Sequence, residues 1–129
     1  MTDEELIETA KAYRKRAYAP YSHFAVGAAV RTQSGRVYGG CKIDNASYPV
    51  ACCAERTAIF KAVSEGERAI EVLAVVADTD GPCAPCGMCR QAISEFRIPR
   101  ILMANLKGGV REVTLQELLP FAFSEQDLG

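Results

Sequence analysis

The amino-acid sequence predicts an α/β fold in one domain, and three observations lead to this class. Apolar stretches of strand length alternate along the chain with segments whose apolar residues recur at helical spacing. The chain has 129 residues, the size of one domain, and folding such a chain buries roughly two thirds of its surface. It contains no internal repeat, low-complexity tract or linker. We therefore expect a single domain over residues 1–129.

The first helix is predicted from signals at its start and its end. Thr2 and Glu5 have the spacing of a capping box, which favours a helix start. Apolar residues then recur at helical spacing as far as Ala17. Pro20 disfavours helical backbone at the residue before it, so the helix is expected to end at Ala19.

A hairpin and a second helix follow. The two strands of the hairpin are expected over 24–30 and 37–43, with the turn around Gly35. Over 53–65, alanines recur along one helical face, and Gly66 suits the position just past a helix end. Side chains this small indicate that the helix packs closely against its neighbours.

The second half of the chain continues the alternation. Residues 72–77 are a continuous apolar run, which is typical of a central strand buried on both faces. The remaining expected elements are a helix over 86–96, strands over 101–104 and 110–113, and a last helix opened by Thr114-x-x-Glu117.

Strands and helices alternate between residues 37 and 104 in the order of two crossover units. Right-handed crossovers predict that the strands 37–43, 72–77 and 101–104 are parallel neighbours. Both crossover helices then begin at the carboxyl edge of the sheet, where open α/β sheets bind ligands. The helix starts at residues 52 and 85 are therefore expected to face one crevice.

Composition excludes several classes of protein. Fifteen basic and sixteen acidic side chains give a net charge of −1, which offers no electrostatic footprint for nucleic acid. No apolar run reaches the roughly 18 residues of a membrane span, and the acidic N-terminal segment is unlike a secretory signal. We expect a cytoplasmic protein, in which six cysteines serve as ligands or catalytic thiols rather than disulfides.

The stretch PCGMC places Cys86 and Cys89 one turn apart at a helix start, where the helix dipole favours thiolate. A thioredoxin-like redox pair also lies between a strand and a helix, so redox chemistry is an alternative for this motif alone. With Cys83 the spacing begins an iron–sulfur run, but Ile93 stands where its next cysteine belongs. The iron–sulfur alternative therefore fails.

Cys53 is expected at the start of the other crossover helix, close to Cys86 and Cys89. Three converging thiolates repel one another, and a zinc ion would relieve that repulsion. A fourth ligand would make the site structural, whereas an open position would make it catalytic. Candidates for the fourth ligand are Cys52, Cys83 and His23, although the pattern requires none of them. As buried or inert thiols, Cys41, Cys52 and Cys83 need no further role.

Glu55 is the residue that favours a catalytic site. If Cys53 sits at the helix cap in extended backbone, its thiolate and the Glu55 carboxylate border one spot. A carboxylate beside the open position of a bound zinc acts as a general base for the attacking water. The alternative is that Glu55 only complements the helix N-terminus, as acidic residues often do.

Together, Cys53-Ala54-Glu55 and Pro85-Cys86-Gly87-Met88-Cys89 resemble the signature of zinc-dependent deaminases of cytosine and adenine. Further stretches are similar to short, bacterial-type cytidine deaminases, and they run in the right order from residue 18 to residue 128. These stretches are YAPYSHFAVGAAV, G-C-x-I-x-N-A-S-Y, CAERTAIFKAVSEG, PCGMCRQ and ELLPFAFSEQDL.

The resemblance implies a three-layer fold with a five-stranded mixed sheet, one zinc ion per chain and a homotetramer with active sites at subunit contacts. It implies that Cys53, Cys86 and Cys89 bind the zinc and that Glu55 is catalytic. Arg56 is expected to donate to the ligand sulfurs, with a surface ion pair as the alternative. The implied substrate contacts are Phe24 and Phe123 at the base, Lys42 and Asp44 at the ribose, and Ala54.

The implied function is hydrolytic deamination of cytidine and deoxycytidine in pyrimidine salvage, with a small nucleoside as partner and neither nucleic acid nor membrane. One departure bears on the substrate, because the family pattern G-C-N-I-E-N reads G-C-K-I-D-N here. Lys42 offers donors only and Asp44 is one methylene shorter than glutamate. A related cytosine nucleoside or nucleotide is therefore an alternative substrate. A redox protein and a zinc-stabilised interaction module are alternatives from other classes.

Overall fold

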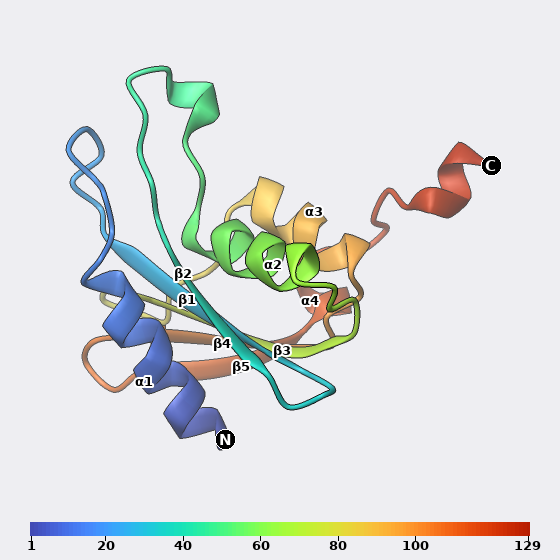
Figure 1. Ribbon diagram of the computed structural model, residues 1–129, viewed down its shortest axis with the longest axis horizontal. Helices are drawn as coiled ribbons and strands as arrows, with labels where there is room; N and C mark the ends of the chain where they lie inside the picture. Colours follow the sequence, from blue (N-terminus) through green and yellow to red (C-terminus); the bar gives the residue numbers. More distant parts are fainter.

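The computed structural model describes residues 1–129, which form a five-stranded mixed sheet with helices on both faces (Figure 1). The strands are β1 (Val26–Thr32), β2 (Val37–Cys41), β3 (Ile70–Ala77), β4 (Arg100–Asn105) and β5 (Val110–Thr114). The helices are α1 (Asp3–Arg14), α2 (Ala54–Ser64), α3 (Gly87–Glu95) and α4 (Leu115–Leu118), with 3₁₀ turns at Tyr48–Val50 and Glu125–Leu128. The predicted α/β class and the five-stranded mixed sheet are confirmed.

The order of the strands in the sheet is β2-β1-β3-β4-β5, and only β3 and β4 pair in parallel. The prediction that 37–43 and 72–77 are neighbours is therefore wrong. The hairpin partner β1 lies between them and pairs antiparallel with both, so they run in the same direction without touching. Pairing of β1 along both of its edges provides partners for its backbone hydrogen-bonding groups, and the crossover rule does not take this pairing into account.

Helix α1 ends at Arg14, five residues before the position that Pro20 suggests. The chain leaves the helix because Tyr18 pairs with the segment beyond β2. The Tyr18 amide donates to the Lys42 carbonyl at 2.9 Å, and the Asp44 amide donates to the Tyr18 carbonyl at 2.7 Å. This long-range pairing replaces the last helical turn and ties the 18–24 segment to the 42–44 segment.

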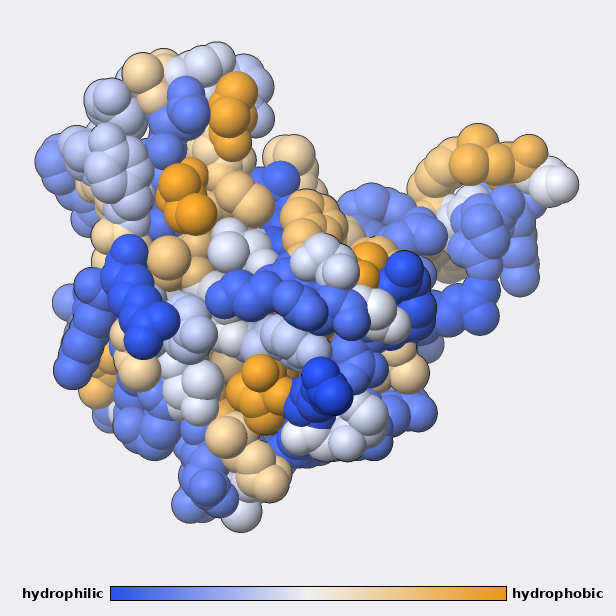
Figure 2. All heavy atoms as spheres, viewed as in Figure 1, coloured by the Kyte–Doolittle hydropathy of each residue, from blue (hydrophilic) through white to orange (hydrophobic).

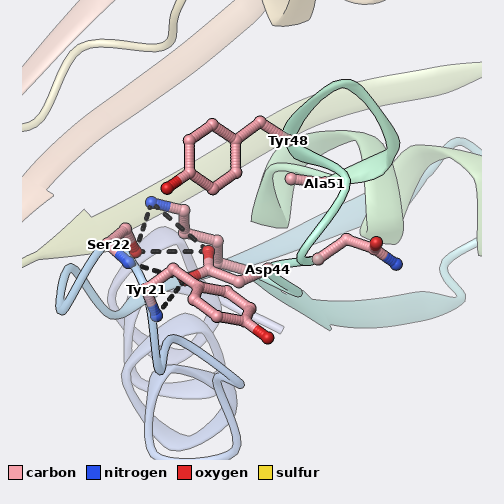
Figure 3. Close-up of a pocket in the computed structure, with 7 residues that line it drawn as sticks. Tyr21, Ser22, Asp44, Tyr48 and Ala51 are labelled. Atoms are coloured by element: carbon pink, nitrogen blue, oxygen red, sulfur yellow. Dashed lines mark hydrogen bonds and ion pairs between the residues drawn. The ribbon is translucent and has the colours of Figure 1, made fainter.

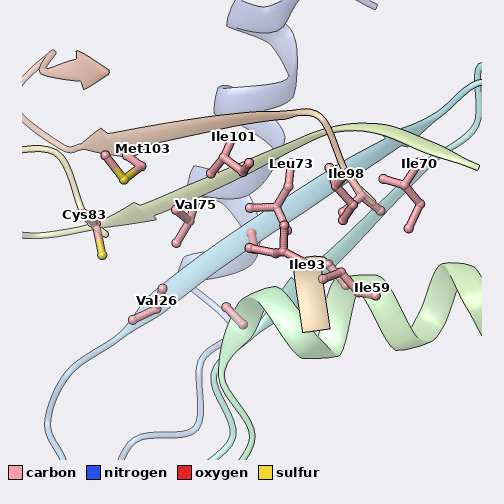
Figure 4. Close-up of a cluster of buried hydrophobic side chains, with 14 of the residues drawn as sticks. Val26, Ile59, Ile70, Leu73, Val75, Cys83, Ile93, Ile98, Ile101 and Met103 are labelled. Carbon is pink, nitrogen blue, oxygen red and sulfur yellow. The ribbon is translucent and has the colours of Figure 1, made fainter. Parts of the chain in front are cut away.

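The apolar run on β3 is buried on both faces, as predicted, because the sheet has a core on each side. Alternate residues such as Leu73 and Val75 face α2 and α3, while Val72 and Ala74 face α1. Figure 4 shows the larger core, in which isoleucines of the helical layer meet the sheet. The sheet is thus the middle of three layers.

The predicted helix starts at Thr2 and Thr114 both carry complete capping boxes. The longest helix, α1, has 12 residues, and no helix is both long and apolar enough to cross a bilayer. After α4 the chain extends away from the body as an arm (Figure 1). Phe121, Phe123 and Leu128 on the arm are solvent-exposed. Figure 2 shows apolar surface on part of the arm.

Candidate active site

Helices α2 and α3 both begin at a cysteine. Cys53 and Cys86 are the N-cap residues, with extended backbone at φ −70° and ψ 154° and 172°, respectively. Cys89 follows one turn into α3, where its side chain is fully buried. The prediction that Cys53 precedes the helical geometry is confirmed, and both helix dipoles point their positive ends at the cysteines.

The sulfur atoms of Cys53, Cys86 and Cys89 lie within 4.8 Å of one another, and Sγ of Cys53 is 3.6 Å from Sγ of Cys86. Three sulfurs this close can share one tetrahedral ion, and thiolates are ligands that zinc favours. The donor set therefore fits zinc. The candidates for a fourth ligand, Cys52, Cys83 and His23, do not belong to this cluster, so it leaves a position open.

The contact between the Cys53 and Cys89 thiols gives these two groups different pKa values. The pKa of Cys53 is lowered to about 5, chiefly because the Cys89 thiol donates a hydrogen bond to its sulfur. The pKa of Cys89 is raised, since that same hydrogen bond requires the Cys89 proton and burial opposes its charge. Of these two thiols, Cys53 therefore ionises more readily.

Arg56 approaches the same sulfur from the first turn of α2. Its Nη2 lies 3.6 Å from Sγ of Cys53, while its buried Nε has no hydrogen-bond partner. The guanidinium contributes to the lowered pKa of Cys53 and partly balances the negative charge that three thiolates would gather. The alternative of a surface ion pair finds no support, since Arg56 forms no ion pair with a carboxylate.

Glu55 is the charged residue that the fold buries beside the thiols, with only 4% of its surface exposed. Burial raises the pKa of Glu55 to about 7, and the negative charge on Cys53 adds to this, while its backbone amide hydrogen bond and Arg56 oppose it. A carboxyl group with this pKa can accept and donate a proton near neutral pH.

A hollow of about 250 Å³ opens over the thiols and Glu55. It is lined by Phe24, Val26, Lys42, Cys53, Glu55, Cys83, Ala84 and Cys86. Three predicted contact residues do not line it, and one of them, Asp44, lines a neighbouring hollow instead. The side chain of Ala54 is fully buried in the core, and Phe123 lies on the extended arm, where its carbonyl accepts from Gln91 Nε2 at 2.9 Å.

Residues 1–105 match the family model described as the cytidine and deoxycytidylate deaminase zinc-binding region, which includes all three cysteines. The chain belongs to this deaminase family. It is 53% identical to a cytidine deaminase of Sporosarcina psychrophila over 99% of this chain and 96% of the relative. A cytidine deaminase of Halalkalibacterium halodurans is 48% identical over 99% of this chain and 98% of the relative.

The fold of the chain is similar to those of solved members of the deaminase family. The crystal structure of cytidine deaminase from Burkholderia pseudomallei superimposes with a TM-score of 0.92 at 50% identity, covering 95% of this chain and 100% of that one. The matched family region is described as zinc-binding, and the three thiols of this chain are positioned to bind a metal ion.

A second hollow of about 350 Å³ adjoins the first in this deaminase. It is lined by Tyr21, Ser22, Lys42, Asp44, Asn45, Tyr48 and Ala51. The tyrosine rings flank it with centroids 6.5 Å apart, and Figure 3 shows both rings beside the Ser22–Asp44 contacts. Sequence analysis missed Tyr21, Ser22 and Tyr48, although aromatic residues in loops are a signal of binding sites.

Asp44 and Lys42 lie together, with Nζ of Lys42 3.9 Å from Oδ1 of Asp44. Asp44 is buried, and its Oδ2 accepts from the amides of Tyr21 at 3.2 Å and Ser22 at 2.9 Å. The Ser22 hydroxyl donates to Oδ1 at 3.2 Å. The hydrogen bond from the Ser22 amide is the largest cause that lowers the pKa of Asp44.

Proposed function

We propose that this protein is a zinc-dependent cytidine deaminase with one deaminase domain over residues 1–129, and that it converts cytidine and deoxycytidine to uridine and deoxyuridine. The observation that carries the proposal is the buried carboxyl of Glu55 in one hollow with Cys53 and Cys86, whose sulfurs converge with that of the buried Cys89. Identities of 53% and 48% over nearly the full length to proteins named cytidine deaminase support the choice of substrate. We place the reaction in cytoplasmic pyrimidine salvage.

In this proposal Cys53, Cys86 and Cys89 hold one zinc ion per chain. When bound, zinc supplies Lewis acidity, which lowers the pKa of water towards neutrality. Three thiolates would give the centre a formal charge of −1, which weakens a Lewis acid. The two helix N-termini and the Arg56 guanidinium face the sulfurs and offset part of that charge.

Glu55 moves the protons of the reaction. As the oxygen of water attacks C4 of the pyrimidine, the Glu55 carboxylate takes a proton from that water. The protonated Glu55 delivers this proton to N3. It then takes the second proton from the new C4 hydroxyl and passes it to the C4 amine, so that ammonia leaves and a carbonyl forms at C4. The raised pKa of Glu55, about 7, suits a group that must both accept and donate.

The remaining residues position the nucleoside. Phe24 borders the hollow with a ring that is 40% exposed, and we assign it to the face of the pyrimidine. Ala54 has no exposed side chain, so its contact with the substrate is through the backbone at the start of α2. Lys42 and Asp44 lie on the sugar side.

We also propose a homotetramer in which the arm of one subunit completes the site of another. Phe123 is 58% exposed, so its side chain is not part of the hydrophobic core of its own chain. Phe121 and Leu128 on the same arm are exposed as well, and a second copy of the chain would cover this apolar surface. Phe123 would then reach the base bound by a neighbouring subunit.

The decisive experiment is an ultraviolet absorbance assay with purified protein and cytidine. We expect the absorbance to change as the amine is lost, the activity to disappear after treatment with a strong chelator, and zinc to restore it. A zinc-loaded protein that leaves cytidine unchanged would contradict the proposal. Metal-independent reduction of disulfides would favour the redox alternative, and zinc binding without turnover would favour an interaction module.

A further inference from the structure

We propose that Lys42 makes the second hollow a binding site for a phosphate group on the sugar, so that the enzyme accepts cytosine nucleotides as well as free nucleosides. This inference rests on the proposed deaminase function and concerns the sugar side of the same site. The evidence is the position of Lys42, the commitment of Asp44 and the chemistry of the second hollow.

Lys42 is the one residue that lines both hollows. The hollow over the thiols holds about 250 Å³, which is below the range of roughly 300–1,000 Å³ for pockets that enclose small ligands. It is large enough for a base, and the sugar must then pass Lys42 towards the second hollow of about 350 Å³. Any substituent on the sugar therefore meets the Lys42 ammonium.

Some N–H donors of the Lys42 ammonium are not used in hydrogen bonds within the protein. Its Nζ donates one hydrogen bond, to the Ser22 hydroxyl at 3.0 Å, and its distance of 3.9 Å from Asp44 is too long for a second. An ammonium has three N–H groups, so two of them have no acceptor. The side chain is only 18% exposed and its Nζ lies 5.2 Å from the centre of the Phe24 ring, which limits screening by solvent.

Asp44 is ionised and lies 3.9 Å from Nζ of Lys42, so it offsets part of this charge, but it takes none of the ammonium's hydrogen bonds and is poorly placed to accept from sugar hydroxyls. Both of its oxygens already accept hydrogen bonds from Tyr21 and Ser22, and only 6% of the residue is exposed. Its role is to hold the 21–22 turn. A substrate on this side therefore finds unused N–H donors on Lys42 and a carboxylate whose oxygens already accept hydrogen bonds from the protein.

The other groups around the second hollow are neutral, and several of them can donate. Oδ1 of Asn45 accepts from the Ser47 amide at 2.8 Å, which leaves its NH₂ group free to donate. The hydroxyls of Tyr21 and Tyr48 can donate as well, and both rings line the hollow. The oxygens of a fully ionised phosphate accept hydrogen bonds and donate none, so this set of donors matches it.

The test compares the wild-type enzyme with Lys42→Gln and Lys42→Arg. For each protein, kcat/KM is measured with cytidine, deoxycytidine and their 3′- and 5′-monophosphates, which shows where the phosphate must stand. For at least one monophosphate isomer, we expect the ratio of kcat/KM for the nucleotide to kcat/KM for the nucleoside to fall roughly 10- to 100-fold in Lys42→Gln. This is the change expected when one charged hydrogen bond is lost. Lys42→Arg should retain most of that ratio because it keeps the cation.

Lys107→Gln is the matched control, because Lys107 pairs with Asp80 at 2.8 Å and lines neither hollow. Its nucleotide-to-nucleoside ratio should equal that of the wild type. A wild-type enzyme that deaminates cytidine, with a ratio that Lys42→Gln does not change for any isomer, overturns the inference and leaves the proposed function intact.

Binding of the product provides a readout that does not need turnover. Calorimetric titration with uridine and the uridine monophosphates should show tighter binding of one monophosphate to the wild type, weakening at high salt and in Lys42→Gln. If no protein turns over cytidine but this difference in affinity appears, the proposed function fails and the phosphate site stands. Equal affinities for uridine and all of its monophosphates would refute the site.

Discussion

Gly40 on β2 packs directly against the backbone of Ala58 on α2. A β carbon added at Gly40 would overlap the backbone nitrogen of Ala58 and lie 2.8 Å from the carbonyl oxygen of Ala54. The small residues along this face of α2 are fully buried, so the helix approaches the sheet as closely as the backbone allows. This approach determines where α2 begins and thus where Cys53 and Glu55 stand.

We predict that Gly40→Ala destabilises the protein by about 1–3 kcal/mol or more, because neither backbone can yield without moving α2. The displacement should also lower zinc content, since Cys53 caps this helix. Thermal unfolding and metal analysis measure the two effects. Gly81→Ala is the control, because a β carbon there meets nothing within 4 Å. Equal stability of Gly40→Ala and the wild type would contradict this packing.

Glu55→Gln should keep its zinc and lose turnover by about 10²–10⁴-fold or more, because the amide preserves the shape but cannot accept the proton of water. Cytidine turnover and the zinc-to-protein ratio are measured on the same preparation. Glu65→Gln, at the exposed far end of α2, should behave as the wild type. Full activity of Glu55→Gln would rule out the proton-transfer role.

Cys53→Ala should lower zinc content from about one ion per chain to a small fraction, because two remaining thiols cannot hold a tetrahedral ion tightly. Cys41→Ala is a matched loss of one thiol outside the cluster, where Sγ of Cys41 donates to the Arg16 carbonyl at 3.5 Å. It should retain the metal. Elemental analysis that finds full zinc occupancy in Cys53→Ala would show that the ligand set is different.

Asp44→Asn should reduce stability at neutral pH, and the deficit should shrink in acid. The folded-state pKa of Asp44 is lowered below its ordinary value of 3.8, mainly by the hydrogen bond from the Ser22 amide. Its ionised form therefore stabilises the fold above that value, and the contribution is lost as the pH falls through the lower folded-state pKa. Urea midpoints of the two proteins, compared near pH 7 and at about pH 3, measure this narrowing. A constant difference would argue against the contribution of the charge.

Phe123→Ala tests the contribution of the arm. Because Phe123 is exposed within its own chain, its removal should change the stability of the isolated subunit by no more than about 0.5 kcal/mol. If Phe123 contacts the base in a neighbouring subunit, kcat/KM for cytidine should fall roughly tenfold. Val110→Ala, exposed on β5, is the control. Gel filtration establishes the oligomeric state, and unchanged kinetics of an intact oligomer would exclude the contact.

Local sequence patterns predict many of the secondary-structure elements and the candidate zinc ligands of this protein. The capping boxes at Thr2 and Thr114, the apolar run of β3 and the position of Cys53 at the cap of α2 were all predicted from local sequence patterns. Such features depend on neighbours one to four residues away, because side-chain periodicity and caps arise within one element. The candidate zinc ligands and Glu55 belong to this class, which is why sequence placed them at one edge of the sheet.

Tertiary structure alone decided which distant segments meet. Insertion of β1 between β2 and β3, the early end of α1 and the burial of Asp44 against the 21–22 turn all depend on pairings across twenty or more residues. No local pattern encodes them, because a strand edge can pair with any compatible edge and a carboxylate can accept from any nearby amide. The chemistry around the thiols was therefore predictable from sequence, whereas the shape and charge of the sugar side emerged only from the folded chain.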